Sequence, residues 1–212
     1  MKTATLGPEE VDTNHPFTHP DGIPTDLNTL RFMADQLYLF LENPHLYSEE
    51  PRPIILHQPR RDNWTYRMVI VEPEQILGTQ ELIFVGFLGQ RQSNADRVLA
   101  DQFDEILVSE IPDHEGLLAY STMALISGNF SNLVVFNDPE VKVQWSRSRA
   151  HAEAVDSLAP NYYQSVRLYN GRLPKGLSDS TSMYLERIKY FDYQVEPLWH
   201  GVREFEVNGR HG

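Results

Sequence analysis

The sequence predicts an α+β fold built on a ferredoxin-like βαββαβ module, in which two helices lie on one face of an antiparallel sheet. From Glu81 onward, the apolar patterns run in the order strand, helix, strand, strand, helix, strand. The run ELIFVGFL (81–88) is apolar on both sides, which indicates a strand buried on both faces. Because no internal repeat supplies a second sheet, we expect a second copy of the chain to cover the free face.

The chain divides into four segments by composition and pattern. They are an extended arm (1–26), a helix and hairpin extension (27–80), the ferredoxin-like domain (81–173) and a C-terminal strand with a tail (174–212). The arm is rich in Pro, Thr, Asp and Gly, so it would be ordered only by docking on a body or a partner. Its His15 and His19 stand between prolines, a setting that favours solvated loop over a metal site.

A helix is expected from Leu27 to Glu42, with Asp26 as its N-cap. Its apolar residues recur every three or four positions, at Leu30, Met33, Ala34, Leu37 and Leu41. This spacing predicts an amphipathic cover for the main body. Two strand-like runs follow, from Ile54 to Gln58 and from Trp64 to Glu72, and the alternation in the second predicts a sheet edge or an added hairpin.

The main domain continues with a helix from about Ala95 to Glu110, capped by Ser93 or Asn94. Its expected buried stripe comprises Leu99, Phe103, Ile106 and Leu107, with the acidic residues, Asp104 among them, in solvent. Strands are then expected at Leu117 to Ile126 and Ser131 to Phe136.

The second helix of the module is expected to begin at Asp138 and Pro139 and to end at Pro160. Its predicted stripe of small or apolar residues comprises Val141, Trp145, Ser148, Ala152, Val155 and Ala159. Further strands are expected at Gln164 to Leu173 and at Met183 to Tyr193, the latter with Glu186 and Lys189 flanking an exposed edge.

Composition excludes several function classes. The formal net charge of −12 argues against a general nucleic-acid binder and against an anionic membrane surface, since both need clustered Lys and Arg. The absence of cysteine excludes disulfides and thiolate chemistry. No stretch has the apolar length of a signal peptide or of a membrane span, so we expect a cytoplasmic protein without membrane insertion. Phosphate-binding, zinc-protease and serine-hydrolase motifs are absent.

One stretch resembles a known superfamily. The run VVFNDPEVKVQWSRSRAHAEAV (134–155) has a strand, a short acidic turn, and a helix with a Trp followed six residues later by a His. With the preceding element order, this is similar to the dimeric α/β-barrel proteins, which include antibiotic-biosynthesis monooxygenase-like proteins, haem-degrading monooxygenases and the chlorite-dismutase group. The resemblance covers Glu81 to Leu173 and implies a homodimer or a higher homo-oligomer with paired sheets.

His151 and Trp145 are the first candidate site residues. His151 lies at the border of the helix stripe that faces the sheet, where a neutral imidazole could act as a base or ligate haem iron, or serve only as a boundary side chain. Trp145 could wall a pocket for a planar ligand, or be an ordinary core aromatic.

Four further residues complete the candidate set for substrate binding. Tyr120 and Tyr163 could direct a hydroxyl inward, depending on register. Asn132 could hold a phenolate-like substrate, although turn formation is its simpler role. Arg147 belongs to a basic cluster that could steer an anionic group or be a solvated helix face.

Three hypotheses about function follow. The leading one is an oxygenase-like enzyme, possible without any cofactor, that acts on an aromatic or largely apolar molecule between sheet and helices. The second places haem in the same pocket with His151 as the axial ligand. The third is a non-catalytic scaffold whose arm and aromatic tail are assembly surfaces.

Overall fold

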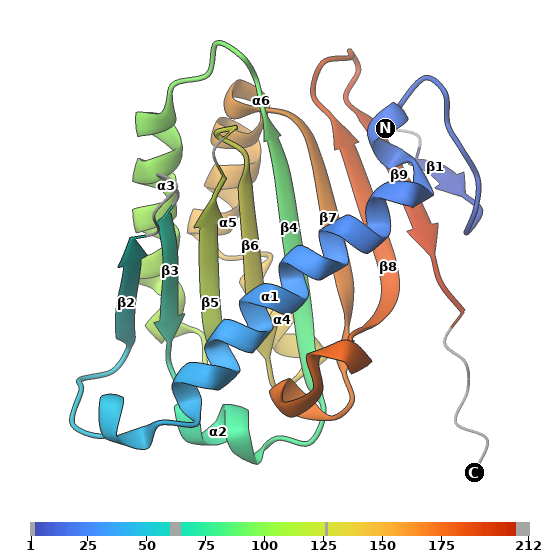
Figure 1. Ribbon diagram of the computed structural model, residues 1–212. Coiled ribbons are helices and arrows are strands. Elements are labelled where there is room, and N and C mark those ends of the chain that lie inside the picture. The colour runs from blue at the N-terminus through green and yellow to red at the C-terminus, as the bar shows by residue number, and fades with distance from the viewer. Residues whose placement is uncertain (1–2, 60–64, 126, 207–212) are drawn as a thin grey trace.

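The computed structural model describes residues 3–59, 65–125 and 127–206 (Figure 1). Within them the chain forms a mixed sheet of nine strands in the order β1-β9-β8-β7-β4-β6-β5-β3-β2. All neighbours are antiparallel except β1 and β9, which are parallel. The strands are β1 (Thr3–Leu6), β2 (Ile54–Pro59), β3 (Thr65–Ile70), β4 (Leu82–Arg91), β5 (Leu117–Ala124), β6 (Phe130–Phe136), β7 (Tyr163–Leu173), β8 (Tyr184–Asp192) and β9 (Trp199–Glu204).

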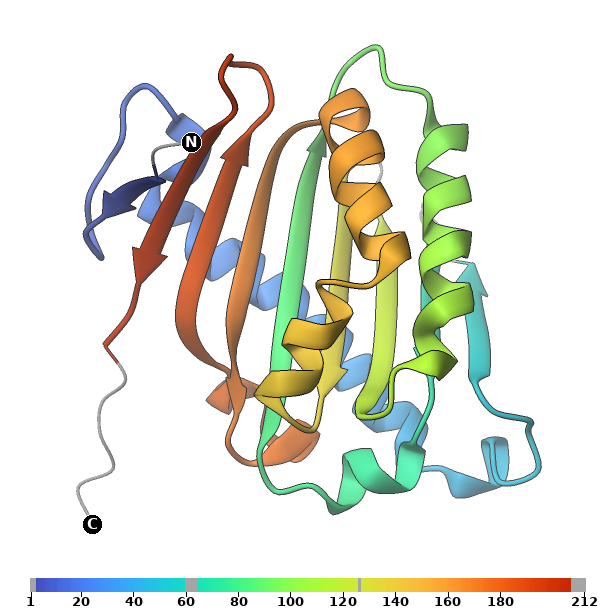
Figure 2. The same ribbon diagram turned by 180° about the vertical axis from the view of Figure 1, so that it is seen from behind.

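Helices lie on both faces of this sheet (Figures 1 and 2). The α-helices are α1 (Ile23–Leu41), α2 (Pro73–Gly78), α3 (Arg97–Glu110), α4 (Pro139–Trp145), α5 (Arg149–Glu153) and α6 (Ala159–Tyr162). A π-helical segment, Ala154–Leu158, joins α5 to α6, and short 3₁₀ turns occur at Pro16–Thr18, Pro20–Gly22, Pro44–Leu46, Ile111–Asp113 and Gly176–Ser182. None of the described helices has the length and apolarity needed to cross a bilayer.

The α+β class predicted from the sequence is confirmed. The central strands follow the order β7-β4-β6-β5, and α3 and the α4–α6 segment lie together on one face, which is the ferredoxin-like arrangement (Figure 2). The sheet is larger than that module. The predicted hairpin β2–β3 adds to β5 at one side, and β8, β9 and β1 extend the other side beyond β7.

The opposite face of the sheet is covered by α1 of the same chain, which crosses it diagonally (Figure 1). The predicted stripe on α1 is confirmed, because Leu30, Met33, Ala34, Leu37 and Leu41 have no exposed surface. They belong to the largest hydrophobic cluster. The reason for expecting a second copy on this face was therefore wrong, and the oligomeric state stays a prediction.

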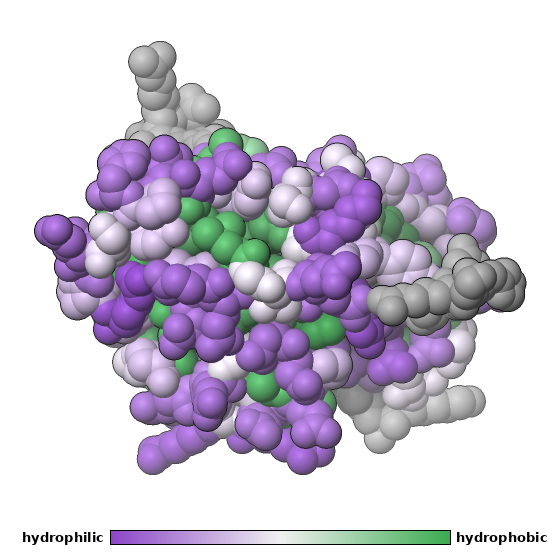
Figure 3. Space-filling model, turned by 90° about the horizontal axis from the view of Figure 1, so that it is seen from below, coloured by the Kyte–Doolittle hydropathy of each residue, from purple (hydrophilic) through white to green (hydrophobic). Residues whose placement is uncertain are grey.

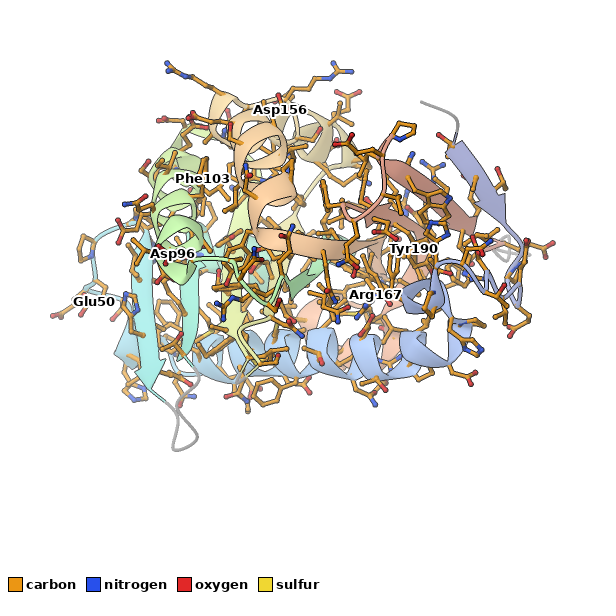
Figure 4. The ribbon with its side chains drawn as sticks, turned by 90° about the horizontal axis from the view of Figure 1, so that it is seen from above. Glu50, Asp96, Phe103, Asp156, Arg167 and Tyr190 are labelled. Carbon is orange, nitrogen blue, oxygen red and sulfur yellow. The ribbon has the colours of Figure 1, made fainter. Side chains whose placement is uncertain are left out.

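Asp26 has a different role from the predicted N-cap. Helix α1 begins three residues earlier, at Ile23, so Asp26 lies in its first turn and faces the sheet. Its carboxylate accepts hydrogen bonds from Arg167 Nε (2.5 Å) and Nη2 (3.0 Å), and from the Tyr169 hydroxyl. Figure 4 shows the Arg167 side chain between the sheet and α1. This buried group fixes the first turn of α1 to β7.

The N-terminal arm is docked on the sheet. Arg203 of β9 has no exposed surface, and it donates hydrogen bonds to the Tyr190 hydroxyl and to the backbone carbonyls of Gly7, Pro8, Glu10 and Thr18. A single buried guanidinium thus holds the arm by its backbone.

Two expectations for the arm and tail are corrected. His15 is not solvated loop, because its ring stacks on Trp199 with centroids 3.7 Å apart and its Nδ1 lies 3.0 Å from Asp12. The edge expected at Glu186 and Lys189 is paired, since the unpredicted strand β9 lies beside β8. The aromatic residues of both segments pack within the chain.

Two details of α3 differ from the prediction. Its N-cap is Asp96, whose Oδ1 accepts from the Val98 amide at 2.9 Å, because Ser93 and Asn94 form a turn that ends before the helix begins. Phe103 is buried as expected, but Ile106 is 42% exposed because it points away from the sheet. The side chain of Leu99 and residue Ile126 lie outside the described residues, as does the start of the predicted strand at Trp64.

The second helix is interrupted, which contradicts the single continuous stripe (Figure 2). After Trp145 the chain leaves the helix, and the Ser148 side chain caps α5 by accepting from the His151 amide. The π-helical segment then adds a further shift in register. Consequently Val155, predicted to be buried, is 46% exposed. Ala152 is exposed too. The residues of this segment that face the core are Trp145, Ala150, Leu158, Ala159 and Tyr162.

The Arg203 clamp gives a test of the docked arm. We expect Arg203→Met to lower the free energy of unfolding by about 3 kcal/mol, because several buried carbonyls lose their donor. The arm should also become the first site cut in limited proteolysis. The control Arg187→Met removes a mostly exposed ion pair to Glu204 and should cost less than ~1 kcal/mol. Equal unfolding curves for the two variants would show that the hydrogen bonds of Arg203 do not hold the arm.

Candidate functional site

The space between the sheet and helices α3 to α6 holds two separate apolar clusters. One comprises Ala95, Ala100, Phe103, Ala124, Phe130, Leu158, Ala159, Tyr162, Tyr163 and Val166. The other comprises Val69, Ile83, Ile111, Leu117, Tyr120, Val134, Phe136 and Trp145. The opposite face has one cluster instead. The two apolar clusters on the helix side of the sheet are separated by polar side chains.

The division follows a row of residues across four strands. Strand register places Arg67 beside Thr122, Thr122 beside Asn132, and Asn132 beside Phe87, on β3, β5, β6 and β4. Residues paired in this way point to the same face of a sheet. The face here is the one under α3, because Asp104 of α3 contacts this row. We call Arg67, Asp104, Tyr120, Thr122 and Asn132 the polar band.

The polar band is a connected hydrogen-bond network. Arg67 Nη2 lies 2.5 Å from Asp104 Oδ2, and the hydroxyl of Tyr120 donates to Asp104 Oδ1 at 3.2 Å. Thr122 Oγ1 also lies within 3.4 Å of Asp104 Oδ1. At the other end, Asn132 Nδ2 donates to the Tyr120 hydroxyl at 3.0 Å. One carboxylate on a helix thus binds side chains from two strands, β3 and β5, and Tyr120 extends the network to β6.

Burial sets the protonation of this network. It raises the pKa of Asp104, while the Arg67 charge and the hydrogen bonds from Tyr120, Arg67 and Thr122 oppose the rise. The pKa of Tyr120 is also raised, by burial first and then by the Asp104 charge. Tyr120 therefore keeps its proton near neutral pH and remains a donor to the carboxylate.

Two atoms of the polar band have no hydrogen-bond partner within the described residues, Arg67 Nε and Asn132 Oδ1. The first is a donor and the second an acceptor, and both are buried. Leaving such a group unpaired costs about 1–3 kcal/mol, so each demands an explanation. They occupy the same row of the sheet, separated by Thr122.

His151 lies on α5, on the same side of the sheet as the polar band. Burial lowers its pKa, so the ring is neutral near pH 7, and its Nδ1 is buried without a hydrogen-bond partner in the described chain. Its ring meets Trp145 edge to face with centroids 6.1 Å apart, and Trp145 meets His114 at 4.9 Å. Trp145 belongs to the same apolar cluster as Tyr120 of the polar band.

The structure brings together some of the predicted site residues. Tyr120 and Asn132 are hydrogen-bonded to each other. Tyr163 packs on Phe87, the neighbour of Asn132 on β4, with ring centroids 5.1 Å apart. Arg147 is exposed in the turn between α4 and α5, so it contributes nothing visible to the polar band. Tyr169 of β7 lies on the opposite face of the sheet, where it contacts Asp26.

Sequence reasoning missed Arg67 and Asp104. Arg67 interrupts an otherwise apolar strand face with Val69 and Val71, and that position was a usable signal. Asp104 was assigned to solvent because it stands among several acidic residues on an amphipathic helix. Its side chain is only 21% exposed, because the Arg67 charge draws it toward the sheet. No group of three or more potential ligands in the described residues could hold a metal ion.

Comparisons with known proteins give little further guidance. No family model and no curated protein sequence matches the chain. Among solved structures, protein SO0527 from Shewanella oneidensis is similar at 13% identity and a TM-score of 0.39, over 44% of this chain and 94% of that one. An aldoxime dehydratase is similar at 19% identity and a TM-score of 0.31, over 58% of this chain and 33% of that one. Neither likeness is close enough to support an argument about function.

The lowered pKa of His151 predicts a pH dependence. At pH values between the pKa of His151 in the folded protein and its ordinary value of 6.5, the unfolded chain binds more protons than the folded chain. The contribution of His151 to stability is therefore fully present above pH 6.5 and is lost as the pH falls below that value. We expect His151→Gln to reduce the loss of unfolding free energy between about pH 7 and pH 5, measured in urea. The exposed control His45→Gln should follow the wild type, and a His151→Gln profile identical to both would contradict the neutral ring.

Proposed function

We propose that the protein binds a small, uncharged, largely apolar molecule between the sheet and helices α3 and α5, at the polar band. The observation that carries this proposal is the pair of unpartnered atoms, Arg67 Nε and Asn132 Oδ1, in one row of the sheet. A ligand that accepts from the first and donates to the second would satisfy both. Purely structural networks in cores are normally satisfied throughout.

The local charges define the class of ligand. Arg67 and Asp104 neutralise each other at 2.5 Å, so the band offers no net charge to an ion. It offers hydrogen bonds between two apolar clusters that are rich in aromatic side chains. A phenol or a similar aromatic molecule with one hydroxyl has the required combination, since its oxygen donates once and accepts as well.

The interrupted second helix supports this location. Breaks and π-helical segments are frequent at functional sites, because they leave a helix locally adaptable. Here the break at Ser146 to Ser148 and the segment Ala154–Leu158 flank α5, which carries His151. Movement of this short helix would open the polar band without unfolding the sheet.

The reaction we propose is oxygenase-like. A neutral His151 would take the hydroxyl proton of a phenol-type substrate, and the second Nδ2 proton of Asn132 would bond the phenolate oxygen. Dioxygen, the oxidant, would then add to the electron-rich ring, and both of its oxygen atoms would enter the product. Trp145 and Tyr163 would form the walls. The neutral imidazole of His151 and its unpartnered Nδ1 support its role as the base.

Haem is the second candidate, favoured by the same unpartnered imidazole nitrogen. The surroundings do not fit a porphyrin well. Trp145, only 5% exposed, meets the His151 ring and packs in the cluster that fills the adjoining space above the sheet. We therefore derive no chemistry from haem. Haem added to the purified protein should give no histidine-ligated Soret band that depends on His151.

Binding can be tested with 2-naphthol, an uncharged fluorescent phenol. We expect saturable binding to the wild type, and at least about tenfold weaker binding by Arg67→Met and Asn132→Leu, because each loses a hydrogen bond to the ligand. The matched control Arg149→Met, an exposed position on α5, should bind like the wild type. Equal affinity in all four proteins would overturn the proposed site.

Turnover can be tested separately from binding. Oxygen consumption with phenolic substrates should be lost in His151→Gln while 2-naphthol affinity changes less than about threefold, because a base acts on the reaction rather than on binding. Full consumption by His151→Gln would remove the oxygenase mechanism and leave the binding site intact.

A further inference from the structure

The helix side of the sheet is only half covered. Helices α3 to α6 lie over the part of the sheet formed by β4, β6, β5 and β3. No helix described here lies over β8 and β9 on that side (Figures 2 and 4). Register aligns Leu168, Lys189 and Val202 in one row across β7, β8 and β9, and Val166, Phe191 and His200 in the next row. We call this surface the open face.

Basic side chains from three elements gather at the open face. They are Lys142 of α4, Arg172 of β7, and Arg187 and Lys189 of β8. Arg187 and Lys189 alternate along β8 and so point to the same face, and Arg172 of β7 pairs with Glu186 of β8. The charges of these groups act on Lys142 as well: burial lowers its pKa first, the charge of Glu186 opposes this, and the charges of Lys189, Arg187 and Arg172 lower it further. Such a cluster is unexpected in a protein of net charge −12.

The two arginines already have carboxylate partners. Arg172 Nη1 lies 2.6 Å from Glu81, and its Nε pairs with Glu186. Arg187 Nη2 lies 2.6 Å from Glu204. These pairs neutralise the guanidinium groups and occupy the neighbouring acidic side chains.

The two lysines have no such partner. Among the described residues, neither Lys142 nor Lys189 lies within 4.0 Å of a carboxylate oxygen. Both are half-buried rather than extended into solvent. The charge of Glu186 acts on Lys142 without forming an ion pair with it, and Glu186 is itself paired with Arg172. An anion between the two ammonium groups would relieve their mutual repulsion.

His200 adds an unused polar atom to the same face. Its ring stacks on Phe191 with centroids 4.8 Å apart, and its Nδ1 lies 3.2 Å from the Thr3 hydroxyl. That leaves Nε2 buried with no partner in the described chain. The Lys189 charge reaches this ring, because it lowers the pKa of His200 after burial.

We propose that the open face binds a small organic dianion, with Lys142 and Lys189 as its cationic ligands and His200 Nε2 as a further hydrogen-bonding group. The charged group is a phosphate monoester or a dicarboxylate, since two unneutralised ammonium groups match two negative charges. Leu168, Phe191 and Val202 give an apolar surface for the organic part. This site adjoins the first apolar cluster through Leu168 and Phe191, but it uses no residue of the polar band and does not depend on the function proposed there.

Thermal unfolding with added anions tests the site. Inorganic phosphate and succinate should each be compared with sodium chloride at equal ionic strength, so that general screening cancels. We expect at least one dianion to raise the unfolding temperature of the wild type in a saturable way. A response to phosphate alone identifies a phosphate ligand, and one to succinate alone identifies a dicarboxylate.

The variants Lys142→Gln and Lys189→Gln should each weaken the dianion response about tenfold or more. The matched control Lys175→Gln, whose ammonium is mostly exposed and pairs with Asp179, should respond like the wild type. Glu204→Gln should strengthen the response, because it frees the charge of Arg187. This gain does not depend on how well the lysine variants fold.

Lysine signals provide an independent readout. The chain has four lysines, Lys2, Lys142, Lys175 and Lys189, so ¹³C-dimethyl labels give a simple spectrum. On addition of the effective dianion, the Lys142 and Lys189 signals should shift and the Lys175 signal should not. The proposal is overturned if neither dianion exceeds sodium chloride, or if the three lysine variants respond equally.

Discussion

The ion pair that fixes α1 to the sheet is the constraint on which the rest of the structure depends. Asp26 receives two hydrogen bonds from Arg167 and one from Tyr169, all from β7, at a position that is 6% exposed. Breaking such a pair by removing one partner typically costs about 3–5 kcal/mol, because the other charge stays buried. With its first turn anchored, α1 is directed across the whole sheet.

This anchoring decides which face of the sheet is available. Leu30 of α1 fits over Gly86, where a Cβ atom would collide with it, and the stripe from Leu30 to Leu41 fills the largest core cluster. The N-terminal arm is held nearby by Arg203. One face is therefore closed by the chain itself, and any ligand that contacts the sheet has to use the helix side.

The side of the sheet covered by α3 to α6 is packed less continuously than the side covered by α1. Its core is divided, its second helix is interrupted, and a charged pair lies in the dividing band. Replacing buried ion pairs by apolar residues is often neutral or stabilising. A band that leaves Arg67 Nε and Asn132 Oδ1 unsatisfied therefore costs stability, which is understandable if those atoms serve a ligand.

Much of the fold could be predicted because it depends on local pattern. The stripe of α1, the hairpin β2–β3 and the order of the module are periodic in sequence, and burial follows period. The covering of the second sheet face by α1 could not be predicted, because no local sequence pattern indicates where a helix that precedes the module will pack. The same holds for β9 and β1, whose pairing joins residues near the two ends of the described chain.

The candidate site was predictable only in part. Tyr120 was identified as a strand residue, but the simpler role expected for Asn132, turn formation, was wrong, because Asn132 lies within β6. Their contact depends on a register that the sequence leaves open. Asp104 resembled its exposed acidic neighbours, since only the Arg67 charge on a different element distinguishes it. The break after Trp145 has no proline or glycine within it to announce it.

Stability and binding measured together in one variant distinguish a ligand site from a structural network in the polar band. Arg67→Met, Asp104→Leu and Tyr120→Phe together replace the polar band by apolar groups of similar size. If the polar band serves a ligand, we expect an unchanged free energy of unfolding or one higher by up to about 4 kcal/mol, together with loss of 2-naphthol binding. A protein destabilised by about 3–5 kcal/mol that still binds the probe would show that the band is structural, and would contradict the account.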